Sequence, residues 1–283
     1  MKKILFVSDL DGTLLNNQHE VSEENVKAIE NFKSDGGLFT FATGRMEETT
    51  LPYVDKLNIN IPLISYNGAR VYCPITKKVI FEERMSVPVD IWGLILKVKQ
   101  PMGIFIYKDN QPFVLKRNEI VEEFEKKEGI TCEDGSLDDF KEVPISKILI
   151  IMKALSNSEK VPALQVLDDE IKISEFSCET VFSEVNYLEI LPKGTSKGKG
   201  LARLIDYLGD KEIYTIAIGD NLNDIPLLTV ANTGIAVRNA QSKLKEVADL
   251  VLDQNNDEHA IAYVIENIIA KEKLDHISLI DNI

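Results

Sequence analysis

The chain has 283 residues, of which 44% are hydrophobic and 28% are charged, a composition typical of a soluble globular protein with room for two domains. Its 46 acidic residues exceed its 32 lysines and arginines, so the net charge is -14. This balance argues against nucleic acid and against an anionic membrane surface as partners, because both attract basic proteins.

The cysteines and the N-terminus favour a cytoplasmic protein. Cys73, Cys132 and Cys178 are far apart and form no CxxC pair, so we expect reduced thiols and neither a zinc site nor a disulfide framework. The apolar run at 4–7 is interrupted by Asp9 before a signal peptide could form. No apolar stripe indicates a strong interface, so a monomer or a weak homodimer is expected.

The first third of the chain alternates apolar runs with helical patterns. Runs at 4–7, 38–42 and 62–65 predict strands. Ser22 is placed to cap a helix that ends at Gly36 and Gly37, and a second helix is predicted over 47–57. This β-α-β-α-β order is typical of a parallel sheet with helices on both faces.

The middle of the chain has a different pattern. Helices are predicted near 89–100, 118–127 and 158–169, and strands near 104–107, 112–115, 147–152, 172–176 and 187–191. Strand pairs beside helices indicate an antiparallel sheet in a separate α+β layer. The acid-rich stretch 119–142 is interpreted as a solvated face.

The first pattern returns near the C-terminus. Leu201, Leu204 and Leu208 lie on one apolar stripe of a predicted helix. Strands follow at 213–218, 233–237 and 250–252, and helices at 222–230 and 259–273. The sequence therefore predicts an α/β parallel-sheet core made of residues 1–83 and 192–283, with an α+β domain of residues 84–191 inserted into it.

Two carboxylates stand where the first predicted strand ends. Asp9 and Asp11 are two residues apart, so on an extended chain they point to the same face. At about 4–5 Å their repulsion is worth roughly 1 kcal/mol in water and several times more in a less polar site. A calcium loop does not fit, because Leu14 stands where that loop requires glycine. The pair marks either a solvated turn or a site for positive charge.

Four polar clusters follow the apolar strands. They are Asp9-Leu10-Asp11, Thr43-Gly44-Arg45, the loop KGTSK that contains Lys197, and GDNLND from Gly219 to Asp224. Three of them directly follow a strand, where open parallel sheets bind ligands, and Lys197 begins a helix. Each cluster alone is explained by turn or surface residues. Together they offer carboxylates for Mg²⁺ and a lysine and a threonine for phosphate.

The same motifs carry a family resemblance. DLDGTLL, TGR, the lysine of KGTSKG, and GDNLND resemble the four ordered motifs of the haloacid dehalogenase superfamily. The long interval from Arg45 to Lys197, and SYNGA at 65–69, resemble its Cof-type sugar-phosphatase branch, in which a cap domain is inserted at this place. The resemblance implies a Rossmann-like core with an inserted cap and a Mg²⁺-dependent phosphatase of small phosphorylated metabolites.

The resemblance also implies roles for single residues. Asp9 would be the nucleophile that forms an aspartyl-phosphate, Asp11 the general acid and base, and Lys197 a third catalytic residue. Mg²⁺ would bind the carboxylates of Asp9 and Asp220 and the backbone carbonyl of Asp11. Asp224 would be a further metal ligand or a support. The phosphate group would be held by Leu10, Thr43, Gly44, Lys197 and Asn223.

Two other functions stay open at this point. A phosphosugar mutase or another phosphotransferase would use the same chemistry but pass the phosphoryl group to a second hydroxyl. A non-catalytic regulatory protein would only bind a phosphometabolite. The pair Asp9 and Asp11 argues against the second alternative, because binding alone needs neither a nucleophile nor an acid and base.

Overall fold

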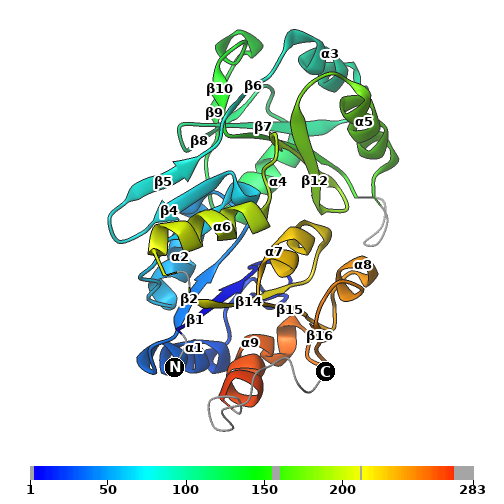
Figure 1. Cartoon of the computed structure of the whole chain (residues 1–283). Coiled ribbons are helices and arrows are strands. Elements are labelled where there is room, and N and C mark those ends of the chain that lie inside the picture. Colours follow the sequence, from blue (N-terminus) through cyan, green and yellow to red (C-terminus); the bar gives the residue numbers. More distant parts are fainter. Residues whose placement is uncertain (1–2, 155–159, 211, 271–283) are drawn as a thin grey trace.

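The computed structural model describes residues 3–154, 160–210 and 212–270 and has two main sheets (Figure 1). A five-stranded parallel sheet has the order β16-β15-β14-β1-β2. A six-stranded, mostly antiparallel sheet has the order β12-β13-β11-β7-β8-β9. We call the part built on the first sheet the core and the part built on the second sheet the cap. The predicted α/β core with an inserted α+β unit is confirmed.

The core is formed by both ends of the chain. Its parallel strands are β1 (Ile4–Ser8), β2 (Leu38–Phe41), β14 (Tyr214–Gly219), β15 (Thr233–Ala236) and β16 (Leu250–Val251). A small antiparallel sheet adds β3 (Leu63–Ser65), β4 (Arg70–Cys73) and β5 (Lys78–Glu82). The helices are α1 (Glu23–Ser34), α2 (Glu47–Lys56), α6 (Lys197–Leu208), α7 (Ile225–Val230), α8 (Ser242–Lys245) and α9 (Ala260–Tyr263). Single turns are η1 (Tyr66–Gly68), η3 (Leu222–Asp224) and η4 (Asn256–Glu258).

The cap is formed by the middle of the chain. Its strands are β6 (Met85–Ser86), β7 (Met102–Lys108), β8 (Gln111–Val114), β9 (Glu133–Asp134), β10 (Pro144–Ile145), β11 (Lys147–Met152), β12 (Cys178–Glu184) and β13 (Tyr187–Pro192). Its helices are α3 (Val89–Lys97), α4 (Glu119–Glu128), α5 (Pro162–Ile173) and the turn η2 (Leu137–Asp139). The domain boundaries at 84 and 191 stay a prediction.

The central strand of the core is buried on both faces. Leu5, Phe6 and Val7 of β1 have no exposed surface, as expected for a strand of a parallel sheet that helices cover on each side. The ring of Phe6 packs edge-on against Phe32 of α1 and Phe39 of β2, with centroids 6.3 and 5.6 Å apart. Helix α1 begins where the sequence predicts, and the Ser22 side chain accepts the N–H of Asn25. The predicted strand and helix are both confirmed.

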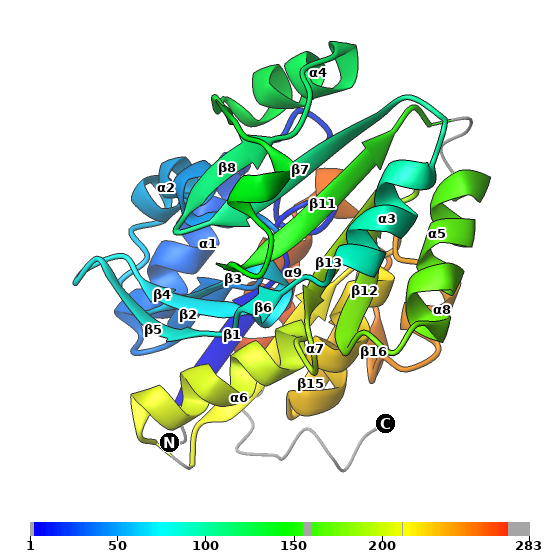
Figure 2. The ribbon, with the colours of Figure 1, turned by 90° about the horizontal axis from the view of Figure 1, so that it is seen from above.

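The cap sheet has two different faces because its side chains alternate. Ile104, Ile106 and Ile148 point to the face that α3 and α5 cover (Figure 2). Phe105 and Leu149 point to the opposite face, where they form an apolar cluster with α4 and with Met46, Tyr66 and Ala69 of the core. The cap therefore packs on the core through the second face of its sheet.

Two local predictions are wrong or incomplete, and one hairpin was missed. The segment 172–176, where a strand was expected, contains the last two residues of α5 and part of the loop that follows it, and the strand begins instead at Cys178. The strand at 62–65 forms the antiparallel sheet with β4 and β5, and it pairs with the residue after β2 through a parallel bridge between Ala42 and Ile64. The hairpin of β4 and β5 was not predicted.

The helices of this chain are short. The longest described helices, α1, α5 and α6, have 12 residues each. Helix α9 continues as a π-helical turn, η5 (Val264–Ile269), and the predicted end of this helix at residue 273 lies outside the described residues. In the described ranges no helix is both long and apolar enough to cross a membrane.

Gly68 allows η1 to touch the start of α6. Its φ is +94°, and a Cβ there would lie 1.9 Å from the carbonyl oxygen of Ser196. Gly36 has a similar φ of +88° but open space around it, so it is a matched control. We expect Gly36→Ala to lower the free energy of unfolding by about 1 kcal/mol, through backbone strain alone. Gly68→Ala should lower it by about 3 kcal/mol or more, as measured by urea-induced unfolding. Equal losses would contradict a close packing requirement at Gly68.

Candidate active site

The site lies where three neighbouring strands of the core sheet end. In register, Ser8 of β1 lies between Ile218 of β14 and Phe41 of β2. Asp9 directly follows β1, and its N–H donates to the Ile218 carbonyl at 2.9 Å. Asp220 directly follows β14, and Thr43 lies two residues after β2. The parallel register therefore brings these three polar residues to one edge of the sheet.

A buried lysine joins two of the carboxylates. Lys197 is the first residue of α6, and its side chain is 1% exposed. Its Nζ lies 2.5 Å from Asp9 Oδ1 and 2.6 Å from Asp224 Oδ1. These acids raise the pKa of Lys197 above its usual value against the effect of burial, so the ammonium stays charged. The three side chains come from three distant segments that the fold brings together.

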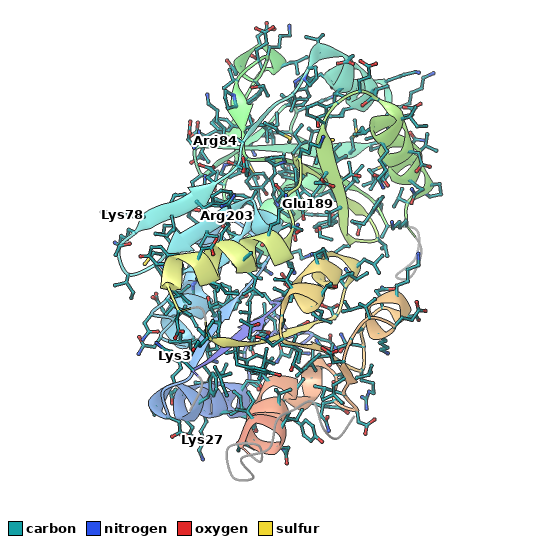
Figure 3. The ribbon with its side chains drawn as sticks, viewed as in Figure 1. Lys3, Lys27, Lys78, Arg84, Glu189 and Arg203 are labelled. Carbon is teal, nitrogen blue, oxygen red and sulfur yellow. The ribbon has the colours of Figure 1, made fainter. Side chains whose placement is uncertain are left out.

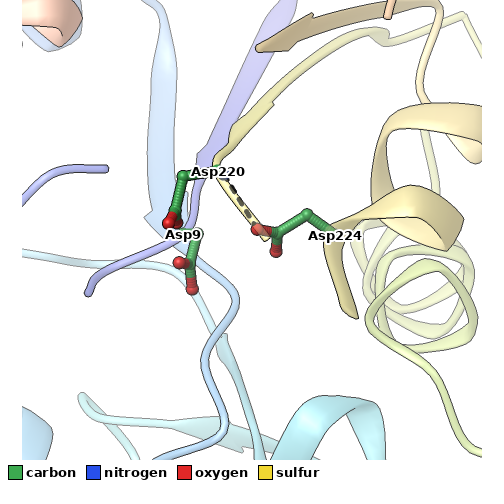
Figure 4. A group of neighbouring side chains, drawn as sticks. All are labelled: Asp9, Asp220 and Asp224. Carbon is green, nitrogen blue, oxygen red and sulfur yellow. Dashed lines mark hydrogen bonds between the residues drawn. The ribbon is translucent and has the colours of Figure 1, made fainter. Parts of the chain in front are cut away.

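Asp9, Asp220 and Asp224 form a compact acidic cluster (Figure 4). One carboxylate oxygen from each lies within 4.8 Å of the others. Both oxygens of Asp224 are already bound, since Oδ1 accepts from Lys197 and Oδ2 accepts the N–H groups of Asp220 and Asn221. Asp220 Oδ1 accepts only the Thr13 hydroxyl, at 3.0 Å. Asp220 is thus more open to a further ligand than Asp224.

The charges of this cluster are not balanced by protein groups alone. Burial, with Asp224 nearby, raises the pKa of Asp9 to about 7. Burial and the charge of Asp9 raise the pKa of Asp220 well above its usual value. Among the described residues Lys197 is the only cation that contacts any of the three acids, and it contacts Asp9 and Asp224. A divalent cation with oxygen ligands fits this set, because it would supply the missing positive charge.

Asp11 points away from the acidic cluster and binds an arginine. Arg45 donates from Nε to Asp11 Oδ2 at 2.8 Å and from a terminal nitrogen to Oδ1 at 2.7 Å. Although burial acts in the opposite direction, the hydrogen bonds and the charge of Arg45, with His19 nearby, hold the pKa of Asp11 well below its usual range. The structure thus separates the two aspartates of the first motif into different charge environments.

The other predicted site residues surround the acids. Thr43 is buried, its Oγ1 accepts the N–H of Arg45, and it lines a cleft together with Gly44 and Asn223. Leu10 is buried, and its carbonyl accepts from the turn that follows. Asn223 donates to Asn67 Oδ1 at 3.0 Å. Asn67 Nδ2, which has no hydrogen-bond partner among the described residues, lies beside Gly44.

The cleft lies between the core and the cap and has a volume of about 90 Å³. Its core side includes Asp9, Asp11 and Thr43. Its cap side combines aromatic rings with charged groups, namely Tyr107, Phe124, Lys127, Glu128, Lys147, Glu184, Tyr187 and Glu189. A phosphate group at the acids would therefore leave the rest of its molecule facing the cap.

A buried ion pair of the cap closes one side of this cleft. Lys147 and Glu189 lie 2.9 Å apart on neighbouring strands, and both side chains are at most 4% exposed. Lys147 also donates to the Gly44 carbonyl of the core at 2.8 Å. Glu189, labelled in Figure 3, comes from β13, where the chain returns to the core. The cap therefore contacts the core at Gly44, a predicted phosphate-binding residue.

Several cleft residues were not predicted from the sequence. Arg45 belongs to a quoted motif but was given no role, although its place directly after Thr43 and Gly44 was a signal. Glu128 lies in the stretch that was interpreted as solvated, yet its side chain is only 9% exposed and pairs with Arg45. Lys147 and Glu189 sit in apolar strands, and nothing in the sequence marks them.

The whole chain is similar to a known family. A family model described as haloacid dehalogenase-like hydrolase matches residues 6–265. The Bacillus subtilis protein YxeH is 30% identical over 94% of this chain and 98% of its own length. The Bacillus subtilis protein YwtE, a 5-amino-6-(5-phospho-D-ribitylamino)uracil phosphatase by name, is 28% identical over 93% of this chain and 96% of its own. The crystal structure of a haloacid dehalogenase-like hydrolase from Bacteroides thetaiotaomicron has a TM-score of 0.76 and 26% identity, with 94% and 100% of the chains covered.

Asp220→Asn is expected to stabilise the protein in Mg²⁺-free buffer. The pKa of Asp220 is raised in the folded state, so the contribution of this group to stability is fully present below about pH 4 and is lost as pH rises toward that raised pKa. The variant should therefore melt about 3–8 °C higher than the wild type at pH 8, with a smaller difference at pH 5. Added Mg²⁺ should raise the melting temperature of the wild type and of the exposed control Asp206→Asn. An equal rise in Asp220→Asn would contradict a cation site there.

Proposed function

The chain belongs to the haloacid dehalogenase-like hydrolases, in their Cof-type branch, and is a phosphatase; on that premise we propose that it hydrolyses phosphate monoesters of small metabolites through an aspartyl-phosphate at Asp9. The observation that carries this proposal is the buried contact of Lys197 with Asp9 beside an acidic cluster. A carboxylate attacks a phosphate dianion only where positive charge offsets their repulsion. Lys197 lies where it can supply part of that charge.

The first step is phosphoryl transfer to the enzyme. An oxygen of the Asp9 carboxylate forms a bond to phosphorus, and the bond from phosphorus to the ester oxygen breaks. Because the pKa of Asp11 lies well below its usual range, Asp11 must take up a proton from solvent as the phosphate dianion binds beside it, and it gives this proton to the leaving oxygen, which departs as an alcohol. The backbone N–H of Leu10, with Thr43 and Asn223, would hold the other phosphate oxygens in this proposal.

The second step restores the enzyme. Water attacks the phosphorus of the aspartyl-phosphate and gives a proton to Asp11, which is now a carboxylate. The bond between phosphorus and the Asp9 oxygen breaks, and inorganic phosphate is released. The low pKa that Arg45 gives to Asp11 favours the base form that this step requires.

Mg²⁺ is the cation that we assign to the acidic cluster. Asp9 and Asp220 would bind it by their carboxylates and Asp11 by its backbone carbonyl, while Asp224, whose oxygens are both engaged, would orient Lys197 and the loop. When bound, Mg²⁺ neutralises phosphate charge and the charge of the acids.

The cap would select the substrate. The aromatic and charged side chains of the cleft, among them Tyr107, Lys127 and Tyr187, face the place where the leaving group would lie. The named substrate of the relative YwtE is a phosphorylated metabolite of small size, and we extend that class, not that compound, to this chain. A sugar phosphate is within the same class.

Asp9→Asn should abolish Mg²⁺-dependent release of phosphate from p-nitrophenyl phosphate, by about 1,000-fold or more, because an amide is not a nucleophile toward phosphorus. The control Asp206→Asn removes an exposed carboxylate and should keep wild-type activity. Inorganic phosphate is measured together with the alcohol product. Equal activity in wild type and Asp9→Asn would refute the nucleophile. In a separate assay with a sugar phosphate as substrate, an isomerised sugar phosphate without free phosphate would indicate a mutase instead.

A further inference from the structure

We propose that Arg45 and Glu128 form a positioning pair that fixes the Asp11 carboxylate in the cleft and ties its position to the cap. This inference rests on the proposed phosphatase function, because Asp11 is assigned there as the acid and base. The pair connects α4 of the cap with the first motif of the core. Arg45 and Glu128 are both positioning residues, since neither is required to touch the reacting atoms.

The contact between Arg45 and Asp11 is bidentate. Two guanidinium nitrogens donate to the two carboxylate oxygens, at 2.8 and 2.7 Å. A fork of this kind fixes the plane of the carboxylate as well as its position, which a single hydrogen bond or a lysine cannot do. His19 Nδ1 lies 3.6 Å from Asp11 Oδ1, beyond hydrogen-bond distance, so this half-exposed ring does not fix the carboxylate.

Arg45 is itself held from the cap. Its third nitrogen donates to Glu128 Oε2 at 2.9 Å, and the Tyr53 ring lies 5.8 Å from the guanidinium carbon. The side chains of Arg45 and Glu128 are 12% and 9% exposed, so their ion pair is shielded from water. Glu128 is the last residue of α4, which packs on the face of the cap sheet that meets the core. A movement of α4 would therefore change the ion pair between Glu128 and Arg45.

The bidentate contact does not block proton transfer at Asp11. Each carboxylate oxygen has two lone pairs, and Arg45 uses one on each. One lone pair on each oxygen stays available to a leaving group or a water molecule in the cleft, which Asp11 lines. Arg45 thus orients the remaining lone pairs and leaves them free to exchange a proton. The consequence is that loss of the pair should slow the steps that use Asp11 and spare the attack of Asp9.

The test compares two aryl phosphates that differ in their need for an acid. Nitrophenolate leaves p-nitrophenyl phosphate without protonation, whereas the leaving group of phenyl phosphate is far more basic and benefits from a proton donor. The value kcat/KM reports the steps up to departure of the phenol, so it isolates the first use of Asp11. We would measure it for both esters with Mg²⁺ in wild type, Arg45→Gln, Arg45→Lys, Glu128→Gln and the control Glu122→Gln, an exposed acid of the same helix.

Arg45→Gln should lower kcat/KM for phenyl phosphate by about 100-fold and for p-nitrophenyl phosphate by less than about 3-fold. Arg45→Lys keeps the charge but not the fork, so it should recover only part of the loss. Glu128→Gln should show the same selective loss at about 10-fold, and Glu122→Gln none. Thermal melts show which variants fold. If Arg45→Gln does not fold, Glu128→Gln still tests the pair.

The contrary results separate the two proposals. Equal losses on both esters would show that Arg45 only supports the fold, and they would overturn the positioning role. A selective loss in Arg45→Gln with wild-type behaviour in Glu128→Gln would overturn the tie to the cap. If the wild type released phosphate from neither ester, the proposed phosphatase function, and with it this inference, would fail at its first step.

Discussion

The structure of the site depends on one buried lysine between two carboxylates. Lys197 has almost no exposed surface, and both of its partners, Asp9 and Asp224, are buried as well. An isolated charge at such a place would cost several kcal/mol, so the ammonium and the acids must be brought together by the fold. The start of α6, the end of β1 and the loop after β14 are therefore fixed relative to one another. The turn at Gly68 contacts α6 one residue before Lys197, so it also helps to fix the start of this helix.

The contact of cap and core combines an apolar cluster with a few buried charges. Phe105, Leu149 and Met46 belong to the cluster, which supplies buried area but does little to fix the orientation of the cap on the core. That orientation is set by polar links, such as Lys147 with the Gly44 carbonyl and Arg45 with Glu128. One link joins a cap residue to a predicted phosphate-binding residue, Gly44, and the other joins a cap residue to its neighbour, Arg45. In the proposal made above, such links couple the position of the cap to the state of the site.

Local pattern was enough to predict most of the core. Three local signals were confirmed, namely the apolar run of β1, the Ser22 cap and the apolar stripe of α6. A buried strand and an amphipathic helix can be recognised from the local order of apolar residues alone. The strand expected at 172–176 was wrong because a short apolar segment fits either a strand or the last turn of a helix. The β4–β5 hairpin was missed because its strands carry mixed polarity, with the charged Arg70 in the buried strand β4, and because β5 is exposed or only partly buried.

The sequence by itself determined the family, the α/β core with its inserted cap, and the list of motif residues, since these follow from local composition and from the order of motifs along the chain. Only the tertiary structure decided how those residues meet. It showed that Asp11 turns toward Arg45, that Asp224 uses both oxygens within the protein, and that Glu128 reaches the cleft from a helix that appeared solvated. The physical reason is that charge pairing acts through space. Which acid neutralises which cation depends on distances between segments that are far apart in the chain, and no local pattern records those distances.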